Sequence, residues 1–423
     1  MKRRYWICLG AVLAIVMSVA IPAAASAAAL WVSPSPTITG NGKSCTEPGF
    51  NSVQTAISTA TAGASIKICS GTYSEQVTIT KSVTLKAQGT PVIALPASPV
   101  VSTTTCGVAM EAAGHTSQIA IEVCGGVTVK ASGLAIEAAW PSGTCDDDLY
   151  GVFVGGGASL SLSNSRILAA GAKPINGCQG GIGIEIGTTR PTPALTGSAK
   201  LTNVLVEGYQ KNGINIIGSG SEATLKKVTV VGAGPTSEIA QNGIEIARGA
   251  KATISKSSAS DNIYAPATVS STGMLVFEQS AAPISVSNST FENDDIGAYY
   301  GESGTQTLSI SGSKFVNDVF DGVFFEEGNI VLNKDTFNGG EDGIGIYQEK
   351  GQTSGPTGTG NNDKIENMSS YAVIGYSDNE PTDPHGSFKI TNSKISNNPA
   401  GASVQHSVFS ESNSLEIITE KDT

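Results

Sequence analysis

Asn212-Gly-Ile-Asn-Ile and Asn242-Gly-Ile-Glu-Ile stand 30 residues apart, and Gly183-Ile-Glu-Ile precedes the first of them at the same spacing. Related phrases follow, in which glycine or alanine precedes alternating apolar residues, and they begin at Thr272, Ile296, Asp321, Asp342 and Tyr371. Successive phrases lie 21 to 30 residues apart. A repeat of this length built from short alternating strands indicates a parallel β-helix, in which each repeat forms one coil of a solenoid.

The alternation within each phrase predicts one inward and one outward face. Ile184, Ile214 and Ile244 are expected to stack from coil to coil as an inward ladder. Asn-Gly and Asp-Gly pairs suit tight bends that need a positive φ. A second phrase, Ser-Asn-Ser or a close variant, recurs between the first ones at Ser163, Ser287, Ser311 and Thr391. The composition agrees, because 39% apolar residues exclude a disordered chain and 50 glycines exclude a helical bundle.

The N-terminal part of the repeat has a helical pattern. Residues 50–60 place Val53, Ala56, Ile57 and Ala60 on one helical face, which would cover the exposed edge of the first coil. Together with the following Ile66-Lys-Ile-Cys-Ser-Gly-Thr-Tyr, this stretch resembles the opening of right-handed parallel β-helix proteins of the pectin lyase-like superfamily. The resemblance in pattern runs to about residue 410. It implies an all-β fold, a single-stranded right-handed parallel β-helix solenoid over residues 50–413 with an N-terminal amphipathic capping helix and a C-terminal tail at 414–423.

The first 27 residues read as a secretion signal. Lys2-Arg3-Arg4 is the positive region, residues 5–22 are apolar, and Ala25-Ser26-Ala27 suits signal peptidase, so we expect cleavage after Ala27. An uncleaved anchor is the alternative, because the apolar stretch nearly reaches the length of a membrane span. With cleavage after Ala27, residues 28–49 form an N-terminal extension of the mature protein. The mature protein is expected to be secreted, either extracellular or periplasmic, and not membrane-bound.

Six cysteines remain after the signal, and an even number in an exported chain favours disulfides. They are Cys45, Cys69, Cys106, Cys124, Cys145 and Cys178. Sequential pairing is the simplest of the 15 connectivities that six cysteines allow. Metal binding is the competing interpretation, but the sequence has no Cys-x-x-Cys pair.

The net charge disfavours polyanionic partners. The whole chain carries −11, and removal of Lys2, Arg3 and Arg4 leaves −14. A protein this acidic repels nucleic acid unless a basic patch reverses the sign, and no dense Lys/Arg run is present. We expect a monomer whose partner is a polysaccharide or surface glycan.

The middle residues of the repeated phrase would form an outward wall spaced by about 4.8 Å per coil. They are Glu185, Asn215, Glu245, Leu275, Tyr299, Phe324, Gly345 and Ile374. A carboxylate facing the core would be heavily penalised, so Glu185 and Glu245 are expected to point outward, roughly 9.6 Å apart. With Arg248, one of three arginines after the signal, they are the candidate catalytic residues. The alternative is an ordinary solvated strand face.

Aromatic side chains further along this wall are suited to stacking on sugar rings. The candidate substrate-binding residues are Asn215, Tyr299, Tyr300 and Phe324. Asp321 and Asp342 precede equivalent glycines on adjacent coils, roughly 4.8 Å apart. Such a pair either binds a cation, for which Ca²⁺ is the candidate, or shares a proton. The competing interpretation is that Asp-Gly is turn chemistry alone.

The resemblance specifies function weakly, because this fold carries lyases, hydrolases, esterases, epimerases and non-enzymes. Lys211-Asn-Gly-Ile-Asn-Ile-Ile-Gly-Ser resembles a polygalacturonase-type phrase, but Asn212 stands where those enzymes have histidine. Two hypotheses remain. One is an enzyme acting on extracellular polysaccharide, in particular a cation-assisted, lyase-like one. The other is a non-catalytic glycan-binding, adhesion or surface structural protein, and the sequence does not decide between them.

Overall fold

The structure is a computed structural model, and it describes residues 29–34, 41–140, 148–278, 283–301, 306–348, 355–377, 386–398, 404–406 and 416–420. The predicted signal peptide and Cys145 lie outside the described residues. Two helices occur in the described part, α1 (Val53–Thr59) and α2 (Thr105–Ala112), and the rest of the regular structure is parallel β. No helix among the described residues is long and apolar enough to cross a membrane.

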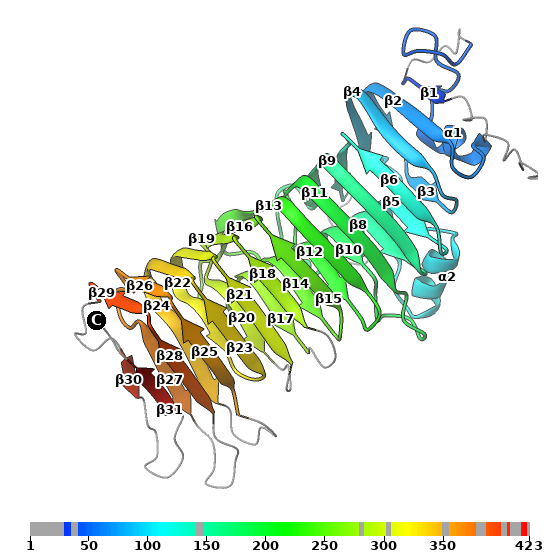
Figure 1. Cartoon of the computed structure of the whole chain (residues 1–423). Helices are drawn as coiled ribbons and strands as arrows, with labels where there is room; N and C mark the ends of the chain where they lie inside the picture. The colour runs from blue at the N-terminus through cyan, green and yellow to red at the C-terminus, as the bar shows by residue number, and fades with distance from the viewer. Residues whose placement is uncertain are drawn as a thin grey trace, which may run out of the picture.

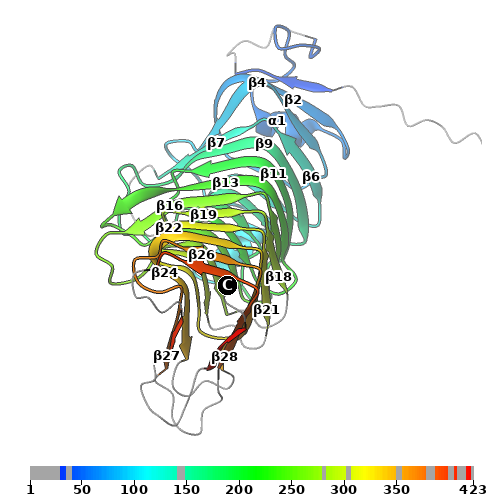
Figure 2. The ribbon, with the colours of Figure 1, turned by 60° about the vertical axis from the view of Figure 1, so that its left-hand side comes forward.

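The strands stack into a solenoid with three faces, which Figures 1 and 2 show from the side and obliquely along the stack. The first face carries the repeated phrase and comprises β3 (Val77–Ile79), β5 (Ser117–Cys124), β8 (Asp148–Gly155), β10 (Ile182–Ile186), β12 (Asn212–Ile217), β14 (Asn242–Ala247), β17 (Thr272–Phe277), β20 (Ile296–Gly301), the C-terminal parts of β22 (Lys314–Phe325) and β24 (Thr336–Gln348), β27 (Val373–Ser377) and β30 (Val404–His406).

The other two faces pair in the same parallel fashion, and several long strands bend at a corner to serve both. The second face contains β1 (Leu30–Val32), β2 (Ser65–Ser74), β4 (Thr84–Ala94), β6 (Thr128–Ser132), β9 (Ala158–Gly171), β11 (Gly197–Glu207), β13 (Glu222–Thr236), β15 (Lys251–Ser255), β18 (Ile284–Ser287), β21 (Thr307–Ser311), β23 (Asn329–Asn333), β25 (Thr357–Asn361), β28 (Ser387–Thr391) and β31 (Glu416–Glu420). The third adds β7 (Ala135–Ala139), β16 (Ser258–Tyr264), β19 (Thr290–Glu292), β26 (Lys364–Glu366) and β29 (Lys394–Ser396).

A capping helix and additional paired strands stand at the ends of the solenoid. Helix α1 buries Val53, Ala56 and Ile57 against the first coil, as the amphipathic pattern predicts. Strand β1, which lies in the predicted extension 28–49, pairs with β2. Strand β31, which lies in the predicted tail 414–423, pairs with β28. The stacked strands therefore reach beyond residues 50–413 at both ends.

The inward isoleucine ladder is confirmed. Ile184 pairs in register with Ile214, which pairs with Ile244, and all three are buried in one continuous core. The expectation that the glycine of each phrase sits at a positive-φ bend is wrong, because these glycines lie inside strands. A Cβ on Gly213 would come within 2.6 Å of the carbonyl oxygen of Gly243. Glycine is needed here because adjacent coils approach closely.

The left-handed corners belong instead to the second phrase. Asn164, Asn288 and Asn392, the middle residues of that phrase, have φ of 49°, 50° and 54°. The serine that follows each of them, Ser165, Ser289 or Ser393, is buried. Asn tolerates this conformation better than most residues, because its side chain can hydrogen-bond locally. The phrase therefore marks the corner between the second and third faces.

Stacked phenylalanines fill the core towards the C-terminus. The rings of Phe291 and Phe315 lie 5.3 Å apart and those of Phe315 and Phe337 lie 4.9 Å apart, both stacked. We expect Phe315→Ala to lower the free energy of unfolding by about 3–5 kcal/mol, because it removes the central ring and leaves a cavity. Thermal or chemical denaturation would measure this. The exposed Val319→Ala is the control, and an equal loss in both variants would contradict the role of the stack.

Two disulfides agree with sequential pairing. Cys45 bonds to Cys69, and Cys106 bonds to Cys124. Cys178 is also disulfide-bonded, but Cys145 lies outside the described residues, so the third predicted pair stays a prediction. The first two link residues 24 and 18 apart, and both are near the N-terminal end of the solenoid.

Candidate functional site

One column of outward side chains runs along the first face. Strand register pairs Glu185 with Asn215 and Asn215 with Glu245, and then continues through Leu275 and Tyr299 to Phe324. We call this the outward column. The order is the one predicted from the middle residues of the repeated phrase, and two earlier members, Glu122 and Phe153, extend it towards the N-terminus.

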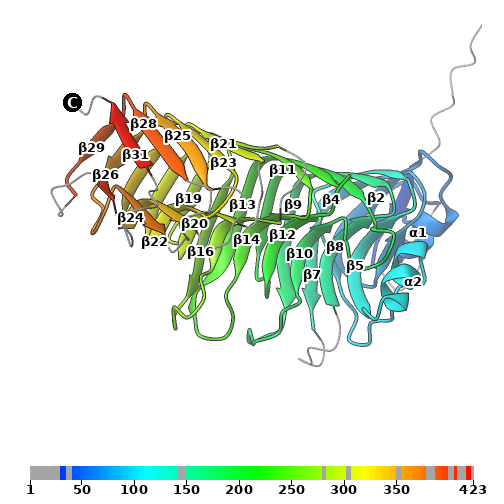
Figure 3. The same ribbon diagram turned by 90° about the horizontal axis from the view of Figure 1, so that it is seen from below.

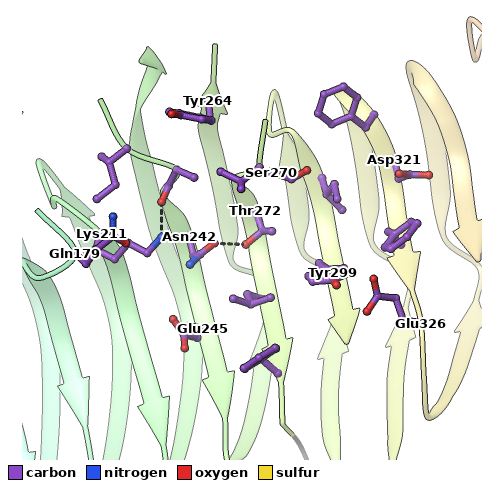
Figure 4. A pocket seen from close by; sticks show the side chains of 18 of the residues that line it. Gln179, Lys211, Asn242, Glu245, Tyr264, Ser270, Thr272, Tyr299, Asp321 and Glu326 are labelled. Atoms are coloured by element: carbon purple, nitrogen blue, oxygen red, sulfur yellow. Dashed lines mark hydrogen bonds between the residues drawn. The ribbon is translucent and has the colours of Figure 1, made fainter. Parts of the chain in front are cut away.

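A groove of two adjoining pockets lies over this column. The pocket nearer the N-terminus has a volume of about 550 Å³ and is lined by Glu185, Asn215 and Arg248 among others. The second has a volume of about 900 Å³ and extends to Tyr299, Asp321 and Phe324. Both include Gln179, Lys211, Glu245 and Phe277 in their walls, so the two pockets form one groove. Figure 4 shows the second pocket, with Glu245 near one side and Glu326 near the other.

Glu185 and Glu245 point away from the core, but Glu185 is buried and Glu245 is only partly exposed. Glu185 is only 2% exposed, and its Oε2 has no hydrogen-bond partner among the described residues. Loop residues such as Arg190 and Ala240 line the groove above the strands. The alternative of an ordinary solvated strand face is therefore wrong, because segments outside the repeat cover this part of the column.

Burial affects the two carboxyl groups unequally. It raises the pKa of Glu185 well above the usual range, and nearby Arg190 opposes this only in part. Burial also raises the pKa of Glu245, but a hydrogen bond from Asn212 and the positive charges of Lys211 and Arg248 counteract it. Glu245 therefore has more partners that stabilise its ionised form.

A chain of hydrogen bonds holds the amide of Asn212, which contacts Glu245, in one orientation. The Thr272 hydroxyl donates to Asn242 Oδ1 at 2.9 Å, and Asn242 Nδ2 donates to Asn212 Oδ1 at 3.1 Å (Figure 4 shows the first bond). Asn212 is thereby left with its Nδ2 facing Glu245, to whose Oε2 it donates at 2.5 Å. These residues stand one coil apart in register, so the repeat itself builds the relay.

Arg190, Asp148 and His115 form a polar wall at the N-terminal end of the groove. Arg190 Nη1 lies 2.6 Å from Asp148 Oδ2 and 2.6 Å from His115 Nδ1. Sequence reasoning missed this group, because the three residues are far apart in the chain and lie outside the repeated phrase. Arg190 follows Glu185 by only five residues, and that proximity is the one signal that could have suggested it.

Arg248, the predicted third catalytic residue, does line the groove. Its Nε forms an ion pair with Glu278 Oε2 at 2.6 Å, and its Nη1 donates to Thr189 Oγ1 at 2.9 Å. Arg248 is about half exposed, whereas Glu185 is buried and Glu245 is partly buried. Its ion pair and hydrogen bond hold it at the rim.

The predicted aromatic residues separate into two groups. Tyr299 and Phe324 face the groove with ring centroids 5.5 Å apart. Tyr300 is not a groove residue: it is buried in the core, and its hydroxyl donates to the Gln306 carbonyl. The assignment of Tyr300 to substrate binding is wrong, because neighbouring residues of a strand point to opposite faces.

Asp321 and Asp342 stand opposite each other in register on β22 and β24, as predicted. Both are buried, and burial followed by the charge of Asp342 raises the pKa of Asp321 well above its usual range. Asp342 Oδ1 accepts the Tyr371 N–H at 2.7 Å. Asp321 lies three coils, or about 14 Å, from Glu245 along the column, and Asp342 lies one coil further away.

This pair does not by itself fit a calcium ion, which takes six to eight oxygen ligands. Among the described residues, no carboxylate, imidazole or thiol joins Asp321 and Asp342 in a group of three with ligand atoms within 4.8 Å of one another. The one such group found consists of Glu122 with Cys106 and Cys124, which are bonded to each other. Calcium binding therefore stays a prediction from the sequence.

Comparison with known proteins defines the class. Residues 194–355 match the family described as the right handed beta helix region. The periplasmic alginate epimerase AlgG superposes with a TM-score of 0.52 and 10% identity, over 84% of this chain and 76% of that one. The Agl-KA catalytic domain superposes with a TM-score of 0.50 and 12% identity, over 87% and 64%. No curated protein sequence matches the chain.

At these identities the structural matches show the fold alone. Together with the family match and the three parallel faces, they define a right-handed parallel β-helix. The chain is therefore a right-handed parallel β-helix protein.

Proposed function

We propose that this chain is a secreted enzyme that cleaves an extracellular polysaccharide lying in the groove, with Glu185 as the proton donor and Glu245 as the base. The observation that best supports this is the state of Glu185, which is buried in the groove wall and has a pKa raised well above its usual range. Its Oε2 has no hydrogen-bond partner in the part of the chain that the structure describes. A carboxyl group whose pKa is raised in this way keeps its proton to higher pH than an ordinary glutamate and can act as a general acid on a leaving oxygen.

The surroundings of the two glutamates support this division of roles. Asn212, Lys211 and Arg248 each favour the ionised form of Glu245, so it should release its proton at a lower pH than Glu185. Two steps along the column place the carboxyl groups roughly 9.6 Å apart. Inverting glycoside hydrolases separate their two carboxyl groups by about 6.5–9.5 Å to admit a water molecule. The coil spacing of the two residues lies at the upper edge of this range and is compatible with hydrolysis.

A cation-assisted lyase reaction, which the sequence suggested, is the alternative for the same groove. It would need a base beside the sugar and a cation that neutralises a uronic acid group. Of the predicted cation pair, Asp321 lies about 14 Å from Glu245 and Asp342 lies further away, and Arg248 forms an ion pair with Glu278. A cation held by Asp321 and Asp342 would therefore contact a part of the substrate that is distant from the reacting atoms.

An activity screen of the mature protein tests the proposal. The substrates are pectate, alginate, xylan and hyaluronan, each with calcium and with a chelator. We expect new reducing ends without ultraviolet absorbance, and no effect of the chelator. Calcium-dependent absorbance from unsaturated products would establish the lyase instead. If no polymer is cleaved but one binds, the non-catalytic glycan-binding alternative is the better account.

The aromatic pair of the groove should contribute to binding rather than to chemistry. We expect Phe324→Ala to raise KM about fivefold with little change in kcat, because loss of an aromatic contact costs on the order of 1 kcal/mol. Steady-state kinetics on the cleaved polymer would measure it. The exposed Val100→Ala, outside the groove, is the control. A fall in kcat with unchanged KM would contradict the assignment.

A further inference from the structure

Helix α2 covers the N-terminal part of the outward column. Its Cys106 and Met110 pack in a second apolar cluster outside the solenoid core, together with outward residues of three strands: Ile119, Cys124, Tyr150, Phe153 and Ile182. Figure 3 shows α2 beside β5, at the end of the first face next to α1. The column position next to Glu185 is therefore filled by Phe153, which is fully buried.

Helix α2 is fastened to the column by several bonds. Cys106 in its first turn is joined by a disulfide to Cys124 of β5. Glu122, the first carboxyl group of the column, accepts hydrogen bonds at 2.5 Å from the hydroxyls of Ser102 and Thr104. Thr104 is also the N-cap of α2 and accepts the Gly107 N–H. A helix held in this way is a fixed part of the fold.

The groove ends at this cover. His115, which follows α2, contacts Arg190, and both line the pocket that contains Glu185. Phe153 and Glu122 are the two preceding members of the column, and neither lines the two pockets of the groove. They are 0% and 1% exposed. A sugar chain that passed beyond Glu185 along the column would have to displace α2.

We propose that the protein acts at the ends of polysaccharide chains, releasing one or two sugar units from the terminus that abuts Arg190 and His115. This inference rests on the proposed function. The reacting bond would lie between Glu185 and Glu245, and only about one coil, roughly 4.8 Å, separates Glu185 from the buried Phe153. The rest of the substrate chain extends over Leu275, Tyr299 and Phe324 in the longer pocket. A closed end next to the acid group excludes cleavage in mid-chain.

The test follows product size on whichever polymer of the panel the mature protein cleaves. We expect mono- or disaccharide from the earliest time, with viscosity falling slowly relative to the rise in reducing ends. The same polymer with both termini capped by a bulky amine-linked tag should be cleaved at least tenfold more slowly. Early oligosaccharides of many lengths would overturn the inference and leave the proposed function intact. Cleavage of no polymer would reject both.

A variant that loosens α2 sharpens the test. In the double variant Cys106→Ser, Cys124→Ser the cover keeps its hydrogen bonds but loses its covalent bond, so longer products should appear while cleavage continues. The matched control is Cys45→Ser, Cys69→Ser, which removes the disulfide that lies away from the groove. Longer products from the control alone would contradict the role of α2. If the α2 variant does not fold, the capped polymer still decides.

Discussion

Replacing Glu185 by glutamine should lower kcat by about 10²- to 10⁴-fold with little change in KM, the range that loss of a general acid produces. Glutamine has nearly the shape of protonated glutamic acid and can occupy the same buried site, but it cannot donate the proton to the leaving oxygen. Steady-state kinetics on the cleaved polymer would measure both constants. Glu222→Gln, which removes an exposed carboxylate on the second face, is the matched control and should be neutral.

The pH profile separates a catalytic role of Glu185 from a structural one. The wild-type profile should be bell-shaped, because activity needs Glu185 protonated and Glu245 ionised. The pKa of both groups is raised, so both limbs should lie above the usual glutamate range. The residual activity of Glu185→Gln should lose the alkaline limb, since that limb reports deprotonation of Glu185. If KM rises and the profile keeps its shape, Glu185 is a wall of the groove and not the acid.

The fold and the outward column could be predicted because the repeat determines both. Once one phrase has its isoleucines inside, period-2 alternation places Glu185, Asn215 and Glu245 outside, and the constant spacing puts them in register. The same rule shows that Tyr299 and Tyr300 cannot both face the groove, so the error at Tyr300 was avoidable from the sequence. The need for glycine inside the strands could not be predicted from one phrase, because a Cβ added at Gly213 would clash with the neighbouring coil.

The electrostatics of the site could not be predicted in this way, because they depend on residues outside the repeat. Arg190 and His115 meet although 75 residues separate them, and no periodic pattern brings them together. Residues outside the repeated phrase, such as Arg190 and His115, likewise line the pocket that contains Glu185. A repeat predicts which residues share a wall, whereas insertions between the repeats decide whether that wall is solvated.

The buried carboxyl groups of Asp335 and Asp363, on another corner of the solenoid, should make the protein more stable in mild acid than at pH 8. The serine of the second phrase recurs as a buried ladder through Ser289 and Ser313, but the next two coils have Asp335 and Asp363 in its place. Burial is the main cause that raises the pKa of Asp335 to about 6 and of Asp363 to about 7. Asp363 Oδ2 has no hydrogen-bond partner among the described residues.

The sign follows from proton binding. The native carboxyl groups hold their protons up to about pH 6 and 7, whereas the ordinary aspartate value is 3.8. Between these values the native state binds more protons than the unfolded state, so the free energy of unfolding falls as pH rises. The contribution is fully present below about pH 4 and is lost as pH passes through 6 to 7. At about 1.4 kcal/mol per pKa unit, the two raised pKa values together account for several kcal/mol. The charge of Asp335 is one of the causes that raise the pKa of Asp363.

Asp363→Ser restores the residue that the neighbouring coils use and removes the buried charge. We expect it to raise the free energy of unfolding at pH 8 by about 2 kcal/mol or more, and to change it little or lower it slightly at pH 5, where the native aspartic acid is already neutral. The measurement is the unfolding midpoint of both proteins at several values between pH 5 and 8. Glu111→Gln, an exposed site on α2, controls for the loss of one negative charge. If the unfolding free energies of Asp363→Ser and wild type vary in parallel with pH, Asp363 is ionised in the native protein and does not contribute the expected pH dependence.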